Sequence, residues 1–272
     1  MTGRIGLSTG ACTDRPILDM LPALEASGVL GLEVSTPPRH FDALHPGQIQ
    51  ALGAALKGQP LHVVSIHAPF GGLLDLAEPN PHHRAAAIGA ILGAASAVTQ
   101  LGGSLVVIHP SDLERHRHDA GARLADCRQS LATLAENCRP LGVTLAVESP
   151  LPHLIGGHPD EFALLLRDLD PSVGVCLDTG HTSLGGHWMR FVEVAGPRLV
   201  HVHAHDNRGH WDDHLPPGDG VINWTAVRES LEAAGFAGWI MLELACPPSE
   251  PDAYFARALE QAARLFGGGP PG

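Results

Sequence analysis

Short apolar runs rich in valine, isoleucine and leucine alternate along the chain with longer stretches of helical periodicity. Runs of this length predict buried β-strands, because most helices need ten or more residues. The expected strands are residues 4–8, 31–35, 61–67, 104–109, 144–149, 173–178, 199–205 and 239–244. The expected helices are residues 17–27, 46–56, 82–101, 119–141, 159–169, 187–195, 224–234 and 252–266.

Local chemistry supports several of these boundaries. Glycine follows the expected helix ends at positions 28, 102, 142 and 235, and Asn223 is suited to cap the helix that starts at Trp224. Strict alternation predicts a parallel sheet, which could be doubly wound, but eight repeats in this length favour a closed (β/α)8 TIM barrel. We expect one α/β domain over residues 1–272, with a flexible tail at residues 266–272.

Polar residues stand at or near the carboxyl ends of these strands. Because alternate side chains of a strand point to opposite faces, Leu145 and Val147 should face the helices while Glu148 points into the barrel. The third strand ends at His67, and parity in four other strands directs inward His109, Asp178, His203 and Glu243. These side chains should converge, because active sites of this fold lie at the carboxyl ends of its strands.

The stretch from Leu199 to Trp224 contains five histidines and four aspartates. So many donors are costly to bury without a partner, and a bound cation is the first explanation to test. One inward glutamate can be a satisfied core residue, but the carboxylates of Glu148, Asp178 and Glu243 in one pocket would repel strongly without a cation.

Composition limits the classes of partner and the cellular location that this chain can have. The net charge of −12 and a single lysine, Lys57, disfavour a nucleic-acid partner. No apolar run is long enough to span a membrane, and the N-terminus does not read as a signal peptide, so we expect a cytoplasmic protein. The five cysteines are scattered without CxxC spacing, which predicts reduced thiols and no thiolate zinc site.

Several motifs together resemble the xylose isomerase-like TIM-barrel superfamily, which joins sugar and sugar-phosphate isomerases and epimerases with endonuclease IV-type enzymes. The resemblance covers nearly the whole chain and is strong for the superfamily but weak for the substrate. It is carried by SIHAPF (65–70), VVIHPSD (106–112), LAVES (145–149), CLDTGH (176–181) and HDNRGHWDDHLPPGDG (205–220), and more weakly by LEL (242–244).

In the isomerase and epimerase branch, the resemblance implies one divalent ion held by Glu148, Asp178, His203 and Glu243. Three carboxylates with one imidazole suit Zn²⁺ or Mn²⁺, and also Mg²⁺ or Co²⁺. The ion would chelate adjacent oxygens of a sugar or sugar phosphate and stabilise an enediolate as a proton leaves carbon. The resemblance makes Glu148 and Glu243 the acid/base pair.

The endonuclease-like branch implies three zinc ions, with His67, His109, His181, Asp212 and His214 as additional ligands. All nine positions are filled, so zinc-dependent phosphoester hydrolysis stays an alternative, with one to three ions per chain. The acidic balance and the lack of evident basic, aromatic-bearing insertions disfavour DNA. In the isomerase-like branch the same histidines bind substrate hydroxyls or orient ligands. Lyase or dehydratase chemistry and a metal-free binding module are further alternatives.

Three more residues are candidates for substrate contact. Glu33 ends the second strand and is placed either to meet a substrate hydroxyl or to pair with a neighbour such as a histidine. Arg208 could meet a phosphate or carboxylate through its planar fork, or it is a solvated loop residue. Trp188 either stacks on a sugar or packs in the fold. The oligomeric state is open, and a homo-oligomer is among the options.

Overall fold

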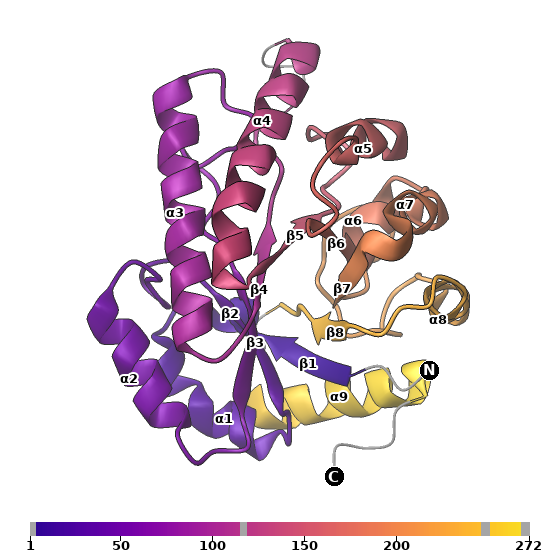
Figure 1. Cartoon of the computed structure of the whole chain (residues 1–272). Coiled ribbons are helices and arrows are strands. Elements are labelled where there is room, and N and C mark those ends of the chain that lie inside the picture. Colours follow the sequence, from indigo (N-terminus) through magenta and orange to yellow (C-terminus); the bar gives the residue numbers. More distant parts are fainter. Residues whose placement is uncertain (1–3, 115–118, 246–250, 268–272) are drawn as a thin grey trace.

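The computed structural model describes residues 4–114, 119–245 and 251–267. Within these residues, eight parallel strands close a barrel in sequence order, and helices surround it (Figure 1). The strands are β1 (Arg4–Ser8), β2 (Gly31–Ser35), β3 (His62–His67), β4 (Leu105–Ile108), β5 (Thr144–Glu148), β6 (Gly174–Asp178), β7 (Leu199–Ala204) and β8 (Trp239–Leu242). The expected (β/α)8 barrel is confirmed, and the doubly wound sheet is excluded because β1 pairs with β8.

The helices follow the strands around the barrel, as the alternating pattern predicts (Figure 1). They are α1 (Leu21–Ala26), α2 (Pro46–Leu56), α3 (Pro81–Gln100), α4 (Ala120–Cys138), α5 (Pro159–Leu166), α6 (Thr179–Leu184), α7 (Trp188–Ala195), α8 (Trp224–Ala233) and α9 (Pro251–Phe266). The expected helix ends are confirmed where glycine takes a left-handed φ, between 67° and 84°, at positions 28, 102, 142 and 235. Asn223 caps α8 by accepting a hydrogen bond from the Ala226 amide.

The structure differs from the expected elements in several places. The expected helix 17–27 is α-helical only over α1, after a 3₁₀ turn at Ile17–Asp19. Helix α5 ends earlier than expected, and Asp168 beyond it takes a left-handed φ of 62°, which is incompatible with a continuing helix. Helix α6 was not expected, and it begins where the Asp178 carboxylate accepts a hydrogen bond from the His181 amide. Phe266 closes α9, as the expected helix 252–266 has it, and is buried, so it does not belong to the tail expected at 266–272, while residues 268–272 lie outside the described part.

Two apolar layers form the core, as strand parity predicts. The large layer lies between sheet and helices and includes Leu145 and Val147 of β5. The small one fills the barrel interior and consists of Val107, Ala146 and Cys176, with Leu105 and Val200 against them. At the amino end of the strands, β1 and β2 approach their neighbours through glycine. A Cβ at Gly6 would overlap the Met241 side chain, and one at Gly31 would overlap Trp239.

The four cysteines in the described residues are buried and form no disulfide, and Cys246 lies outside them. Burial raises the pKa of the Cys138 thiol to about 11, so this thiol is protonated at neutral pH. No described helix combines the length and hydropathy needed to cross a membrane. The cytoplasmic location stays a prediction.

Candidate metal centre

Four donors from separate strands meet at the carboxyl end of the barrel. Glu148 and Asp178 are the last residues of β5 and β6, His203 lies on β7, and Glu243 directly follows β8. One ligand atom from each lies within 4.8 Å of the others. Strand parity predicts this grouping, although the four residues come from four segments of the chain.

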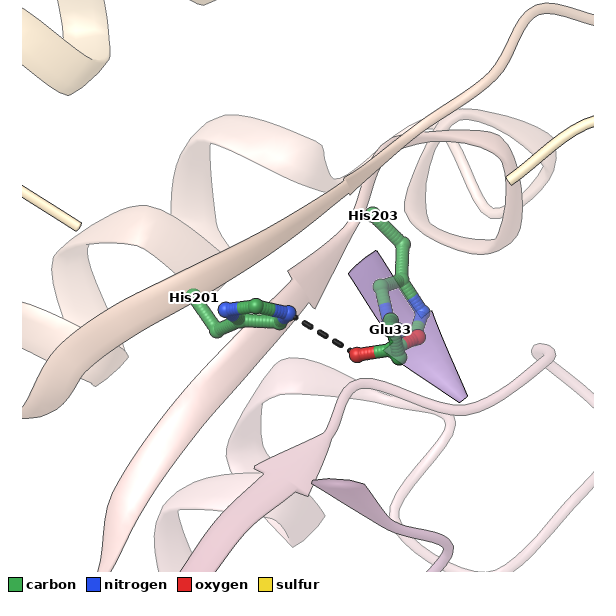
Figure 2. Close-up of side chains that lie close together, drawn as sticks. All are labelled: Glu33, His201 and His203. Carbon is green, nitrogen blue, oxygen red and sulfur yellow. Dashed lines mark hydrogen bonds and ion pairs between the residues drawn. The ribbon is translucent and has the colours of Figure 1, made fainter. Parts of the chain in front are cut away.

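Next to His203, on the side toward the amino ends of the strands, a buried carboxylate from β2 lies between two imidazole rings of β7 (Figure 2). The Glu33 carboxylate reaches across the barrel interior from β2 and accepts a hydrogen bond from His201 Nε2 at 2.9 Å and one from the Ser65 hydroxyl at 2.8 Å. Its other oxygen lies 2.9 Å from His203 Nε2. This leaves His203 Nδ1 facing the central carboxylates. Glu33 and both histidines are completely buried, so Glu33 pairs with neighbours inside the barrel.

Two further histidines converge on Glu148 from β3 and from the loop after β4. His67 Nε2 and His109 Nε2 each lie 3.2 Å from Glu148 Oε2. The ring of Phe70 stacks on His109, with ring centroids 4.0 Å apart, and also contacts His67. Phe70 was not singled out as a site residue in the sequence, although it stands three positions after His67 in the SIHAPF motif.

The first turn of α6 holds a second group of donors. Asp178 Oδ1 accepts a hydrogen bond from the His181 amide at 2.7 Å, and both oxygens of this carboxylate lie 3.0 Å from His205 Nε2. Gly180 makes this approach feasible, because a Cβ there would overlap the His205 ring. Donor atoms of Asp178, His181 and His205 lie within 4.8 Å of one another, as do those of His205, Asp212 and His214.

The loop between β7 and α8 brings Asp212 and His214 to this group. Asp212 Oδ2 lies 3.2 Å from His181 Nε2 and 3.0 Å from His214 Nε2. His214 has a left-handed φ of 48°, and its Nδ1 donates a hydrogen bond to the Glu243 carbonyl at 2.9 Å. A non-glycine residue in this region is strained, and such strain persists only where the surroundings hold the residue in place.

Asp206 organises the same loop from inside and was not among the predicted site residues. Its buried carboxylate accepts hydrogen bonds from the amides of Asn207, Gly218 and Ile222 and from Trp224 Nε1. The last of these is 2.7 Å long and ties the start of α8 to the end of β7. The signal in the sequence is weak, because Asp206 stands among many other histidines and aspartates.

Electrostatics couple these carboxylates to the imidazoles. Burial is the largest single influence on the Glu243 carboxyl and alone would raise its pKa, but His203 lowers that pKa to about 2. The pKa of Glu148 likewise lies well below its usual range, because His109 and His203 outweigh burial. In return, Glu148 and Asp112 raise the pKa of His109 to about 9 against the effect of burial. Both glutamates are therefore ionised at neutral pH.

The donor set fits a divalent cation. Within the described residues, the buried His203 Nδ1 has no hydrogen-bond partner. It nevertheless lies 3.3 Å from Glu243 Oε2, 3.5 Å from Glu148 Oε2 and 3.8 Å from Asp178 Oδ2. An imidazole nitrogen among three carboxylate oxygens is a set that Zn²⁺ and Mn²⁺ accept.

Two adjoining cavities open at this end of the barrel. The smaller, of about 200 Å³, is lined by seven of the predicted ligands: His67, His109, Glu148, His181, Asp212, His214 and Glu243. The larger, of about 800 Å³, extends toward the loops after β2 and β3. The two cavities share the side chains of His67, Phe70, His214 and Glu243.

None of the three expected substrate contacts lines either cavity, and Glu33 instead pairs with His201 and His203 inside the barrel. Arg208 is 66% exposed and pairs with Asp213 at 2.9 Å, which matches its reading as a solvated loop residue. Trp188 begins α7 and packs against the large apolar core, which matches its reading as a packing residue. The structure thus separates both side chains from the donors described above.

The family model described as xylose isomerase-like TIM barrel matches residues 21–265. The chain belongs to this family. Among curated relatives of this xylose isomerase-like barrel, the uncharacterized protein MJ1311 of Methanocaldococcus jannaschii is 30% identical over 188 residues, which cover 66% of this chain and 64% of that protein. A probable endonuclease 4 of Solibacter usitatus is 31% identical over 223 residues, which cover 72% of this chain and 75% of that protein.

Solved structures show the same fold along the whole barrel. A D-tagatose 3-epimerase-like protein has a TM-score of 0.85 at 24% identity, covering 97% of this chain and 98% of its own. The TTHB071 protein from Thermus thermophilus, whose crystal was soaked with ZnCl₂, has a TM-score of 0.72 at 25% identity, with coverage of 97% and 98%.

Proposed function

We propose that this chain is a divalent-metal-dependent isomerase or epimerase of a sugar or sugar phosphate. The observation that carries the proposal is the group of Glu148, Asp178, His203 and Glu243, whose ligand atoms lie within 4.8 Å of one another. The shared fold with a D-tagatose 3-epimerase-like protein supports the same class of reaction. When bound, the ion would polarise a carbonyl oxygen and stabilise negative charge on adjacent substrate oxygens.

We assign proton transfer to the two glutamates, Glu148 and Glu243. Glu148 and Glu243 both line the smaller cavity, so both can face a substrate held there. Their pKa values lie below the usual range, which makes both carboxylates available as bases at neutral pH. One glutamate takes the proton from the carbon beside the carbonyl and becomes protonated. In an isomerase it returns this proton at the neighbouring carbon, whereas in an epimerase the other glutamate, after taking a proton from solvent, delivers it to the opposite face of the enediolate. Glu33 keeps His203 oriented beneath them.

Exchange of the substrate C–H proton with solvent tests this function directly. Protein loaded with Mn²⁺ is incubated in D₂O with D-tagatose, D-psicose or D-fructose, and deuterium at carbon is followed by NMR. We expect exchange in the wild type, loss of exchange in Glu148→Gln, and retained exchange in the matched control Glu136→Gln on the exposed face of α4. Exchange in Glu148→Gln equal to the wild type would remove Glu148 as the acid/base residue.

Phosphoester hydrolysis by a multinuclear zinc site is the second candidate. It is favoured by the two outer donor groups, Asp178 with His181 and His205, and His205 with Asp212 and His214. The similarity to a probable endonuclease 4 points the same way. Elemental analysis separates the two candidates, because the isomerase needs roughly one ion per chain and the phosphoesterase roughly three. In the second case, His109→Ala or His214→Ala should lower both the zinc content and the cleavage of bis(4-nitrophenyl) phosphate.

A further inference from the structure

We propose that the cavity of about 800 Å³ beside the metal centre binds an apolar alkyl or aryl group of the substrate. The substrate would then consist of a hydroxylated head at the donors and an apolar substituent in this cavity. The inference rests on the proposed function for the nature of the head. The apolar substituent is inferred from the residues that line the cavity.

The wall of the cavity away from the donors is apolar. It is formed by Pro37, Leu44, Leu74, Ala86 and Ala90, and Phe70 links it to the donors. Leu44 is 58% exposed and Phe70 is 50% exposed. Large apolar side chains gathered in this way around a concave surface mark a site that gains free energy when an apolar group covers it.

Small residues on α3 make room for such a group. Ala86, Gly89 and Ala90 line the cavity one turn apart, and a Cβ at Gly89 would meet no atom within 4 Å. Farther along the helix, the Leu44 side chain occupies the place that a Cβ at Gly93 would need. The small residues of α3 therefore leave the cavity open along this wall. The side chain of Leu44, from the loop after β2, packs against the helix at Gly93.

Two of the polar groups that line the cavity, Thr36 and Asp42, are engaged within the protein. The Thr36 hydroxyl donates to the His67 carbonyl at 2.7 Å, and the Asp42 carboxylate accepts from the Leu44 amide at 2.9 Å. No lysine or arginine among the described residues lines the cavity. Glu243 and His214 line the cavity at its junction with the donors, so the charge on the apolar side is that of Asp42, which would repel an anionic group placed there. An uncharged apolar group therefore fits better on that side than a phosphate.

The cavity is continuous with the donor group. Phe70 and Glu243 line both cavities, and Phe70 stacks on His109. A single molecule can therefore contact the central donors with one end and the apolar wall with the other. This continuity is why we assign the cavity to the substrate.

The experiment compares two hydroxamates that differ only at the apolar end. The probes are acetohydroxamate and benzohydroxamate, which bind divalent ions through the same two oxygens, and their affinities are measured on Co²⁺-loaded protein by visible absorption. We expect benzohydroxamate to bind about tenfold more tightly or better, as for a phenyl group transferred out of water. Gly89→Phe and Ala86→Phe should abolish this preference and leave acetohydroxamate unchanged.

Ala85→Phe is the matched control, because Ala85 is exposed on the same helix but does not line the cavity. Equal affinity of the two hydroxamates for the wild type, or the same loss in Ala85→Phe as in Gly89→Phe, would overturn the inference. Metal-free protein provides a second measurement: saturation-transfer NMR should detect benzyl alcohol on the wild type and on Ala85→Phe but not on Ala86→Phe. Absence of a signal on the wild type would contradict binding of an apolar group in the cavity.

The two proposals can fail separately. A wild type that exchanges substrate protons but does not prefer benzohydroxamate would retain the isomerase function and lose the apolar site. If the protein shows the expected preference but no proton exchange, the isomerase proposal is wrong and the apolar site remains supported.

Discussion

Replacement of Glu33 by glutamine tests how the barrel interior supports the metal centre. The Glu33 carboxylate contacts His201, His203 and the Ser65 hydroxyl, and all of these contacts are buried. Burial alone would raise the pKa of Glu33, but His203 and His201 lower it well below the usual range, so the group is ionised. Glutamine keeps the shape, removes the charge, and offers one acceptor oxygen in place of two.

The size of the effect follows from these contacts. Hydrogen bonds to a charged group contribute about 1.5–3 kcal/mol, and Glu33→Gln weakens the two from His201 and Ser65 and removes the charge that faces His203. We expect the free energy of unfolding of the metal-free protein to fall by about 2–3 kcal/mol, which lowers the melting temperature by roughly 5–10 °C. Mn²⁺ affinity should fall about 10–100-fold, the usual effect of removing the group that orients a ligating histidine.

Urea unfolding followed by circular dichroism measures the first quantity, and competition with a chelator measures the second. Ser65→Ala is the control, because it removes one neutral donor and keeps both imidazole contacts. It should cost about 1 kcal/mol and leave Mn²⁺ affinity nearly unchanged. If Glu33→Gln bound Mn²⁺ as tightly as the wild type, Glu33 would not orient His203 for metal.

The metal-free protein should lose stability as pH rises from about 6.5 to 9. The pKa values of His109 and His214 are raised from 6.5 to about 9 in the fold, so the stability that these protons supply is complete below 6.5 and lost through 9. Urea midpoints against pH check this, and a flat profile would contradict it. Asp206→Asn should lower the free energy of unfolding by about 3 kcal/mol, because four donors, two of them in buried hydrogen bonds, lose a charged acceptor; calorimetry measures the change. Gly180→Ala should displace His205 from Asp178, cost about 1–3 kcal/mol and lower zinc content, whereas unchanged zinc content would show that this histidine is dispensable.

The sequence predicts the barrel and the central donors for the same physical reason. Parallel strands alternate their side chains between two faces, and the carboxyl ends of all eight strands lie at one edge. An inward residue such as Glu148 or Asp178 at the end of its strand is therefore positioned by the backbone alone. Positions just beyond a strand, such as His109 and Glu243, follow because the chain continues for one residue in the same direction.

Other parts of the site could not be predicted in this way. Pairing of Glu33 with a histidine is one of two interpretations of the sequence, but the partner, His201, stands 168 positions away and is reached only through side-chain length inside the barrel. The larger cavity depends on the small side chains of α3, which leave a space that no motif records. Arg208 and Trp188 stand in loops, where the sequence indicates a nearby position but no direction.

Charge balance links the number of bound ions to the kind of substrate. The central group carries three carboxylates, so one divalent ion and one protonated histidine, such as His109 with its pKa of about 9, bring it to neutrality. This state suits an uncharged sugar. Three divalent ions against these three carboxylates and Asp212 would leave two excess positive charges in a buried site, which requires an anion such as phosphate or hydroxide.

Metal content should therefore depend on added anion if the site is multinuclear. Protein dialysed against dilute ZnCl₂ at pH 6.5 should retain roughly one ion per chain, and the same dialysis with phosphate should leave that number unchanged if the substrate is an uncharged sugar. An increase toward three ions with phosphate would favour the phosphoesterase, because the anion would then supply the missing negative charge. His214→Ala is the informative variant: loss of the added ions with retention of the first would assign them to the outer donors around Asp212.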